Sequence, residues 1–257
     1  MTRIEEAFAK GAALITFITG GDPDIEVTEE LIVNMAKEGA DLIEIGIPFS
    51  DPIAEGPVIQ EANERALRAG TTTDTLFDMI ERVRKQVTVP LVFMTYINPI
   101  YTYGADRFLR RCKEVGIDGV IVPDLPFEEK QELLPLCKSY DITLISMIAP
   151  TSKERIQTIA KEAEGFLYCV SSLGVTGVRT EIGSQVDTMM EEAKKVTDIP
   201  CAIGFGISSS EQAKKMAAIS DGVIVGSAIV KIIEKHQRQC VQPVMEFIRT
   251  LKKVIRE

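Results

Sequence analysis

The sequence predicts a (β/α)8 TIM barrel, because eight short apolar runs alternate with amphipathic stretches along the whole chain. The stretches between the runs carry apolar residues three and four positions apart, which is the pattern of helices that pack on a sheet. Alternation of strand and helix is typical of a parallel sheet. A length of 257 residues suits one such barrel. We therefore expect a single TIM-barrel domain over residues 1–257, with an open, doubly wound sheet as the alternative.

The expected strands follow from the apolar runs in chain order. They are ALITFIT, DLIEIGI, PLVFMTY, DGVIVPD, ITLISMI, FLYCVSS, PCAIGFG and DGVIVGS. Extra helices are expected at residues 2–10, after the second strand, where residues 58–86 are too long for one helix, and after the eighth strand. A unit of helix, aspartate and apolar run recurs in EGADLIEIGIP, VGIDGVIVPDLP and AISDGVIVGSA, as in a barrel of similar units.

The composition excludes several classes of partner. With 29 basic and 38 acidic residues the net charge is −9, which disfavours binding to nucleic acid or to an anionic membrane. The five cysteines are scattered and lack C-x-x-C spacing, which is typical of reduced thiols in a cytosol. No apolar run approaches the roughly 20 residues that span a bilayer. We therefore expect a cytoplasmic protein.

In a βα barrel the active site lies where the strands end, and one buried position on the second strand is acidic. Ile43, Ile45 and Ile47 share one face of that strand, so Leu42, Glu44 and Gly46 point into the barrel. Burial raises the pKa of a carboxyl group toward the range in which it both gives and takes a proton. Glu44 is therefore the leading catalytic candidate, and the alternative is a glutamate that lies on a frayed strand edge or pairs with a core cation.

The loop PFSDPIAEGP follows this strand, and its prolines and glycine exclude a helix. Glu55 in this loop supplies a second carboxylate, although from the residues alone a solvated role fits it better than a catalytic one. Asp51 is an equally good turn residue, and Asp22 and Asp124 fit loop caps.

The last two units carry a phosphate signal, in GFGISSS and VGSAIVKII. Glycines there let the backbone approach an anion, and the second segment opens a short helix whose N–H groups would face it. His236 is the only histidine, so no histidine-ligated metal is expected, and no lysine ends a strand run to form a Schiff base. The reaction type that these exclusions leave is carboxylate acid/base catalysis on a phosphorylated small molecule.

These residues closely resemble the tryptophan synthase α subunit family over essentially the full length. The segments that carry the resemblance are FITGGDP, EIGIPFSDPIAEGPVIQ, YINPI, VPDLP, SSLGVTG, GFGISSSEQ and GSAIVKIIE. The resemblance implies a lyase of tryptophan biosynthesis that cleaves indole-3-glycerol phosphate to indole and glyceraldehyde 3-phosphate without cofactor or metal. It also implies a β subunit as partner in an α2β2 assembly, with any pyridoxal phosphate held by that β subunit.

The resemblance also assigns roles by motif. Glu44 matches the main acid/base, and Glu55 matches the second catalytic carboxylate, where better-known members of the family have aspartate. The matched substrate-binding positions are Phe17, Ile59, Tyr96 and Tyr168 around the indole ring, and Gly177, Gly206, Gly226 and Ser227 around the phosphate. Thr176 lies in the loop SSLGVTGVRTEIG, which resembles the closing lid. Pro48 and Asp51 belong to the loop that contacts the β subunit.

Three other functions remain open at this level. The barrel and phosphate site also fit another lyase or isomerase. The same chemistry fits a stand-alone indole-releasing lyase without a partner. A catalytically silent scaffold is the third, against which an intact Glu44 argues.

Overall fold

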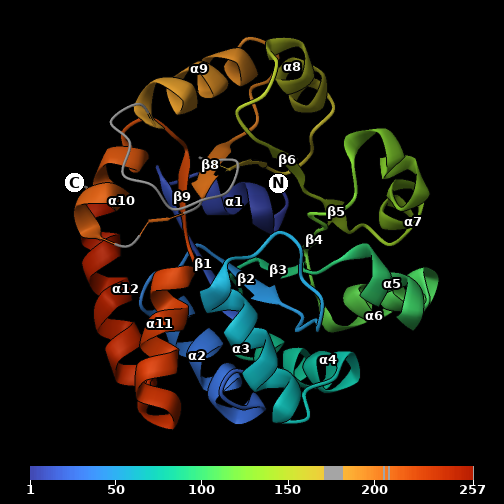
Figure 1. The fold of residues 1–257 in the computed structure, drawn as a ribbon, viewed down its shortest axis with the longest axis vertical. Helices are drawn as coiled ribbons and strands as arrows, with labels where there is room; N and C mark the ends of the chain where they lie inside the picture. Colours follow the sequence, from blue (N-terminus) through green and yellow to red (C-terminus); the bar gives the residue numbers. More distant parts are fainter. Residues whose placement is uncertain (171–181, 205, 208, 257) are drawn as a thin grey trace.

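The computed structural model describes residues 1–170, 182–204, 206–207 and 209–256, and it confirms the barrel (Figure 1). The strands are β1 Ala13–Thr19, β2 Leu42–Gly46, β3 Leu91–Met94, β4 Gly119–Ile121, β5 Thr143–Leu144, β6 Ser146–Ile148, β7 Leu167–Val170, β8 Cys201–Gly204 and β9 Gly222–Val225. All neighbouring strands are parallel, in the order β5-β4-β3-β2-β1-β9-β8-β7-β6. Placement of the whole chain in one domain stays a prediction.

The fifth expected strand, ITLISMI, differs from the prediction because it forms two short strands. β5 pairs with β4 and β6 pairs with β7, so the ladder changes sides at Ile145. The Ile145 N–H still donates to the Val120 carbonyl at 2.9 Å. The two ends of the strand order are thus one residue apart, and the sheet is a nearly closed ring and not an open doubly wound sheet.

The expected extra helices are present among the helices of the described residues. These are α1 Arg3–Phe8, α2 Ile25–Lys37, α3 Pro57–Arg68, α4 Thr73–Arg84, α5 Ile97–Tyr103, α6 Ala105–Val115, α7 Leu134–Ser139, α8 Lys153–Lys161, α9 Ile182–Lys194, α10 Ser210–Ala217, α11 Ser227–His236 and α12 Val241–Arg256, with 3-10 turns η1 Phe127–Glu132 and η2 Gln237–Gln239. Within the described ranges, no helix combines the length and the apolar character needed to cross a membrane.

Two helical segments differ from the expectation. The YINPI segment directly follows the third expected strand, where a connecting loop would begin, but it forms the start of α5. The Asp124 carboxylate accepts the Ile97 N–H at 2.9 Å, and Pro99 falls in the first turn, where no N–H is needed. The amphipathic stretch EEKQELLPLCKSY lies between the fourth and fifth expected strands, where the pattern predicts a helix, but it gives η1 and the six-residue α7. Pro135, at the start of α7, cannot continue a preceding helix.

Side chains of alternate parity separate an inner core from an outer one. On β2, Ile43 and Ile45 pack with helix residues outside the ring, and Leu42 packs inside it, as predicted. Helix α1 closes the end of the barrel where the strands begin, and in Figure 1 it crosses the centre of the ring. Its Ile4 joins the inner core, and the rings of Phe8 and Phe166 lie 5.6 Å apart. The candidate site lies at the opposite end of the barrel, where the strands end.

The recurring aspartates explain the internal repeat. Asp41, Asp118 and Asp221 each precede a strand, and each carboxylate accepts the backbone N–H of a residue on a neighbouring strand, at 2.7, 2.9 and 2.8 Å. The residues contacted are Leu14, Leu91 and Cys201, whose carbonyls accept the N–H of the same aspartates. Each aspartate also pairs with a cation of a helix. These contacts fix strand register at the end of the barrel away from the site.

Asp118→Ala is expected to lower the free energy of unfolding by about 2–4 kcal/mol. The substitution leaves the Leu91 N–H and the Arg84 guanidinium, which is 14% exposed, without their common partner at 2.9 and 3.0 Å. Urea unfolding monitored by circular dichroism measures the loss. The control is Glu211→Ala, which removes an exposed pair with Lys215 and should cost clearly less than Asp118→Ala. Equal losses for the two variants would contradict this role of Asp118.

Candidate active site

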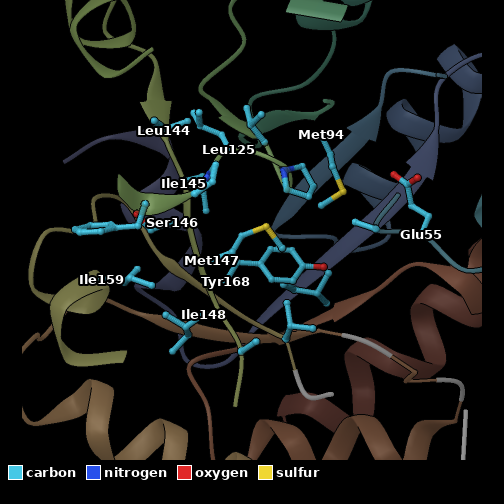
Figure 2. Close-up of a pocket in the computed structure, with 18 of the residues that line it drawn as sticks. Glu55, Met94, Leu125, Leu144, Ile145, Ser146, Met147, Ile148, Ile159 and Tyr168 are labelled. Carbon is cyan, nitrogen blue, oxygen red and sulfur yellow. The ribbon is translucent and has the colours of Figure 1, made fainter. Parts of the chain in front are cut away.

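A cavity of about 800 Å³ opens where the strands end, as expected for a βα barrel. Figure 2 shows it as a hollow with Glu55 on one side and Leu144, Ser146 and Ile159 on the other. Its volume lies within the range of small-molecule sites. Of the predicted site residues, those that line it are Phe17, Glu55, Ile59, Tyr168, Gly206, Gly226 and Ser227.

Glu44 lies on β2 with its side chain inside the barrel, in register with Phe17 on β1 and Val92 on β3. It is fully buried, and neither carboxylate oxygen has a hydrogen-bond partner within the described part of the chain. Burial raises the pKa of this carboxyl to about 8. Glu44 is therefore mostly protonated at neutral pH, and an uncharged carboxyl needs no cation beside it. The side chain lies behind the cavity wall and is not part of its lining.

Glu55 lies in the loop between β2 and α3 and lines the cavity. Burial raises its pKa, the Tyr96 hydroxyl lowers it by a hydrogen bond, and the charge of Asp124 raises it. The Glu55 Oε2 atom is buried without a partner among the described residues. The Tyr96 hydroxyl also accepts the Ala54 N–H at 2.9 Å, so it holds the loop at Glu55 and its neighbour. Glu55 is thus a positioned acid and not a solvated loop residue.

Two aromatic rings form the flat walls of the cavity, and glycines on adjacent strands make room for them. A Cβ on Gly46 would lie 2.8 Å from the Phe17 ring, and a Cβ on Gly204 would lie 2.9 Å from the Tyr168 hydroxyl. Ile59 on α3 adds an aliphatic wall and is 8% exposed. Such walls suit a planar apolar group.

The start of α11 forms the polar end of the cavity. Gly226 precedes the helix as its N-cap and has no side chain to cap it, Ser227 begins the helix, and the first turn contains no acidic residue. The helix N–H groups and the positive end of its dipole are therefore available to an anion. Gly206, after β8, has a φ of +74°, and no atom of the described residues other than its chain neighbours lies within 4 Å of the position a Cβ would take, so it leaves space in the cavity lining.

The structure places the other predicted residues away from the lining. Tyr96 is 2% exposed and lies behind Glu55 as its hydrogen-bond partner. Pro48 is buried at the root of the loop, and Asp51 is exposed. Thr176 and Gly177 lie outside the described residues.

Sequence reasoning missed some residues of the site. Met94 on β3 and Met147 on β6 line the cavity, and their parity on the strands was the available signal. Ile53, in the same loop as Glu55, is 79% exposed, although apolar side chains usually avoid solvent. Among the described residues, no group of three or more His, Cys, Asp or Glu side chains has the arrangement of a metal site.

Asp22, expected as a loop cap, instead braces the site. Its side chain is fully buried and accepts two hydrogen bonds from Arg65 on α3, at 2.8 and 2.9 Å. The same guanidinium lies 4.0 Å from Glu234 on α11. Because Glu55 precedes α3 and Ser227 begins α11, this network fixes the acid and the anion end relative to each other.

Comparison with known proteins identifies close relatives of this arrangement. A family model described as tryptophan synthase alpha chain matches residues 5–256. The tryptophan synthase alpha chain of Alkaliphilus metalliredigens is 48% identical over 241 residues, which cover 93% of this chain and 91% of that one. That of Lacticaseibacillus casei is 46% identical over 252 residues, covering 98% and 95%.

Solved structures agree with the sequence relatives. The tryptophan synthase alpha subunit of Legionella pneumophila superposes with a TM-score of 0.90 at 37% identity, covering 99% of this chain and 98% of that one. A chain from the tryptophan synthase complex of Pyrococcus furiosus gives a TM-score of 0.87 at 36% identity, covering 95% and 99%.

Proposed function

The chain belongs to the tryptophan synthase alpha chain family and cleaves indole-3-glycerol phosphate to indole and glyceraldehyde 3-phosphate, and we propose that Glu44 and Glu55 carry the proton transfers. The observation that carries this proposal is the buried Glu44, whose raised pKa leaves it protonated beside a cavity with apolar walls and an anion end. A neutral carboxylic acid in such a place is a proton donor at pH 7.

The proposed reaction is a retro-aldol cleavage. Glu44 turns from its buried position toward the cavity and protonates the indole carbon that carries the glycerol chain, while the Glu55 carboxylate accepts the indole N–H. The hydroxyl on the adjacent carbon then loses its proton to Glu44, the carbon–carbon bond breaks, and the hydroxyl carbon becomes the aldehyde. Indole leaves with the proton that Glu44 supplied, so atoms and charge balance without water.

The two ends of the cavity fit the two ends of this substrate. The indole ring lies between Phe17, Ile59 and Tyr168, and the phosphate lies against Gly206, Gly226 and Ser227 at the start of α11. Helix amino termini stabilise phosphate dianions through N–H groups and the helix dipole. Binding at both ends holds the reacting carbon in place for proton transfer. Thr176 and Gly177 would complete the phosphate end from the lid segment.

The partner is the tryptophan synthase β subunit, and we propose an α2β2 assembly with Asp51 and its loop at the contact. The two carboxylates supply the acid and base that the cleavage needs, so we propose that this chain uses no cofactor of its own and that pyridoxal phosphate belongs to the β subunit. A cytoplasmic location is proposed as well. All five cysteines are buried and free, which supports a reducing compartment.

Substitutions at Glu55 test its role as the acceptor of the indole N–H. Glu55→Ala is expected to lower the rate of indole release about ten- to a hundredfold, which is the usual effect of losing a hydrogen bond to a charged group. Glu55→Asp should lose less, because a small shift of the loop restores a carboxylate. Steady-state turnover at saturating substrate measures both, with Glu64→Ala, 63% exposed on α3, as the control. Equal turnover of the parent and the alanine variant would overturn this role.

A further inference from the structure

The outer face of the broken strand is not fully covered by helices. Leu144 on β5 faces away from the barrel interior and packs against the outer core. Ser146 on β6 faces the same way, because it shares a strand face with Ile148, which packs in the outer core with α8 and α9. Both are only partly buried. The cause is local: η1 and the six-residue α7 stand where a full helix would cover these strands. A groove therefore runs over β5 and β6, between η1 and α7 on one side and α8 on the other.

Three ion pairs join the two sides of this groove. Glu128 and Lys130 of η1 pair with Arg155 of α8 and with Glu162 just after it, the second pair at 2.6 Å. Lys138 of α7 pairs with Glu164 at 3.1 Å. Five of the six paired side chains are at least 44% exposed, and Lys130 is 12% exposed, so the groove is a channel with its charged pairs mostly toward solvent. We call it the lateral channel; its apolar lining is Phe127, Leu134, Leu144, Ile148 and Ile159.

The lateral channel is continuous with the active site. One cavity touches both the inner side chains Ile145, Met147 and Tyr168 and the outer side chains Leu144 and Ser146 of the same region. Figure 2 shows Met147 and Tyr168 between Glu55 and the group Ser146, Leu144 and Ile159. The cavity therefore has space for a small molecule on both faces of the β5–β6 segment, and the two spaces are connected.

We propose that the lateral channel is a second binding site for a small neutral aromatic molecule with one N–H group, of the indole class. The walls are apolar, which favours an uncharged ring. The charged groups along the channel, Lys130, Arg155, Glu162 and Glu164, are paired with one another or with Glu128 and Lys138, so none is left to hold a phosphate. The Ser146 hydroxyl lines the channel and accepts one N–H. The choice of indole rests on the proposed function, because that reaction releases it.

A titration with indole tests the second site while a substrate analogue blocks the catalytic part of the cavity. Indole is titrated into the protein with saturating 3-(indol-3-yl)propyl phosphate in both cell and titrant, a non-cleavable substrate analogue that fills the catalytic part of the cavity. Calorimetry under the same conditions gives the stoichiometry. We expect one further indole to bind per chain. Ser146→Phe, which fills the channel, should lower this binding at least tenfold, and Thr250→Phe, an exposed position on α12, should leave it unchanged.

Ser146→Ala is the second variant, because it cannot disturb packing as phenylalanine could. It removes only the hydroxyl and should weaken indole binding about two- to tenfold. Absence of indole binding in the presence of the bound analogue, or equal binding by the parent and both Ser146 variants, would overturn the channel site. If the analogue itself does not bind, the proposed function fails, and the Ser146 series still decides the channel because it compares indole binding alone.

Discussion

Glu44→Gln is expected to lower the rate of indole release about a hundredfold or more, while the fold and the phosphate end stay intact. Glutamine has the size and shape of glutamic acid but cannot supply or accept the proton, and a positioned acid/base contributes about 10²–10⁴-fold. Glu44 has no hydrogen-bond partner within the described part of the chain, so the amide breaks no contact there. Single-turnover formation of indole measures the loss. Near-normal turnover with an unchanged melting curve would show that Glu44 is not the acid.

The same variant checks whether Glu44 is buried as an uncharged acid. Burial raises its pKa from 4.5 to about 8, so between these pH values the folded chain keeps a proton that the unfolded chain releases. The stability from this group is complete below about pH 4.5 and is lost as pH rises through 8. The parent should therefore lose stability relative to Glu44→Gln between pH 6 and pH 9. A constant difference across this range would contradict the raised pKa.

A tryptophan synthase β subunit is expected to accelerate indole release by this chain about tenfold or more. The loop that carries Glu55 exposes Asp51 and Ile53, the latter 79% exposed, and a partner that covers them would favour one arrangement of the loop. If about 1% of the free chains have that arrangement, a few kcal/mol of contact makes it dominant. Indole release with and without saturating β subunit measures the effect. No acceleration with confirmed binding would reject this coupling.

Variants in this loop separate coupling from basal activity. Asp51→Ala should weaken the response to the β subunit more than the basal turnover, because Asp51 is exposed and is not part of the cavity lining. Pro48 is a poorer test than the sequence suggests. It is buried at the root of the loop, so its replacement would change the loop in the free chain as well.

Strand and helix positions followed from periodicity because parallel strands buried on both faces leave apolar runs that are easy to find. The inward direction of Glu44 followed from the same alternation. The break at Ile145 could not be predicted, because ITLISMI has the composition of one strand and the change of pairing partner depends on β4 and β7. Helix α5 depends on Asp124, which lies 27 residues away from Ile97 and caps it only in the folded chain.

The site shows the same division between local pattern and tertiary contact. The glycines and Ser227 were found because their motifs are short and continuous in the sequence. The hydrogen bond of Tyr96 to Glu55 and the Asp22–Arg65 pair join segments 41 and 43 residues apart, and no local pattern encodes them. Tyr96 consequently has a place behind the acid and not in the wall of the cavity. The lateral channel depends on the shortness of α7, which its amphipathic sequence concealed.

The most direct test of the account is to mix the purified chain with indole-3-glycerol phosphate and measure indole and glyceraldehyde 3-phosphate together. Cleavage by Glu44 and Glu55 predicts equal amounts of the two products, formed slowly by the chain alone and faster with a β subunit, and at least about a hundredfold less with Glu44→Gln. Absence of both products from folded parent protein, with and without the β subunit, would contradict it.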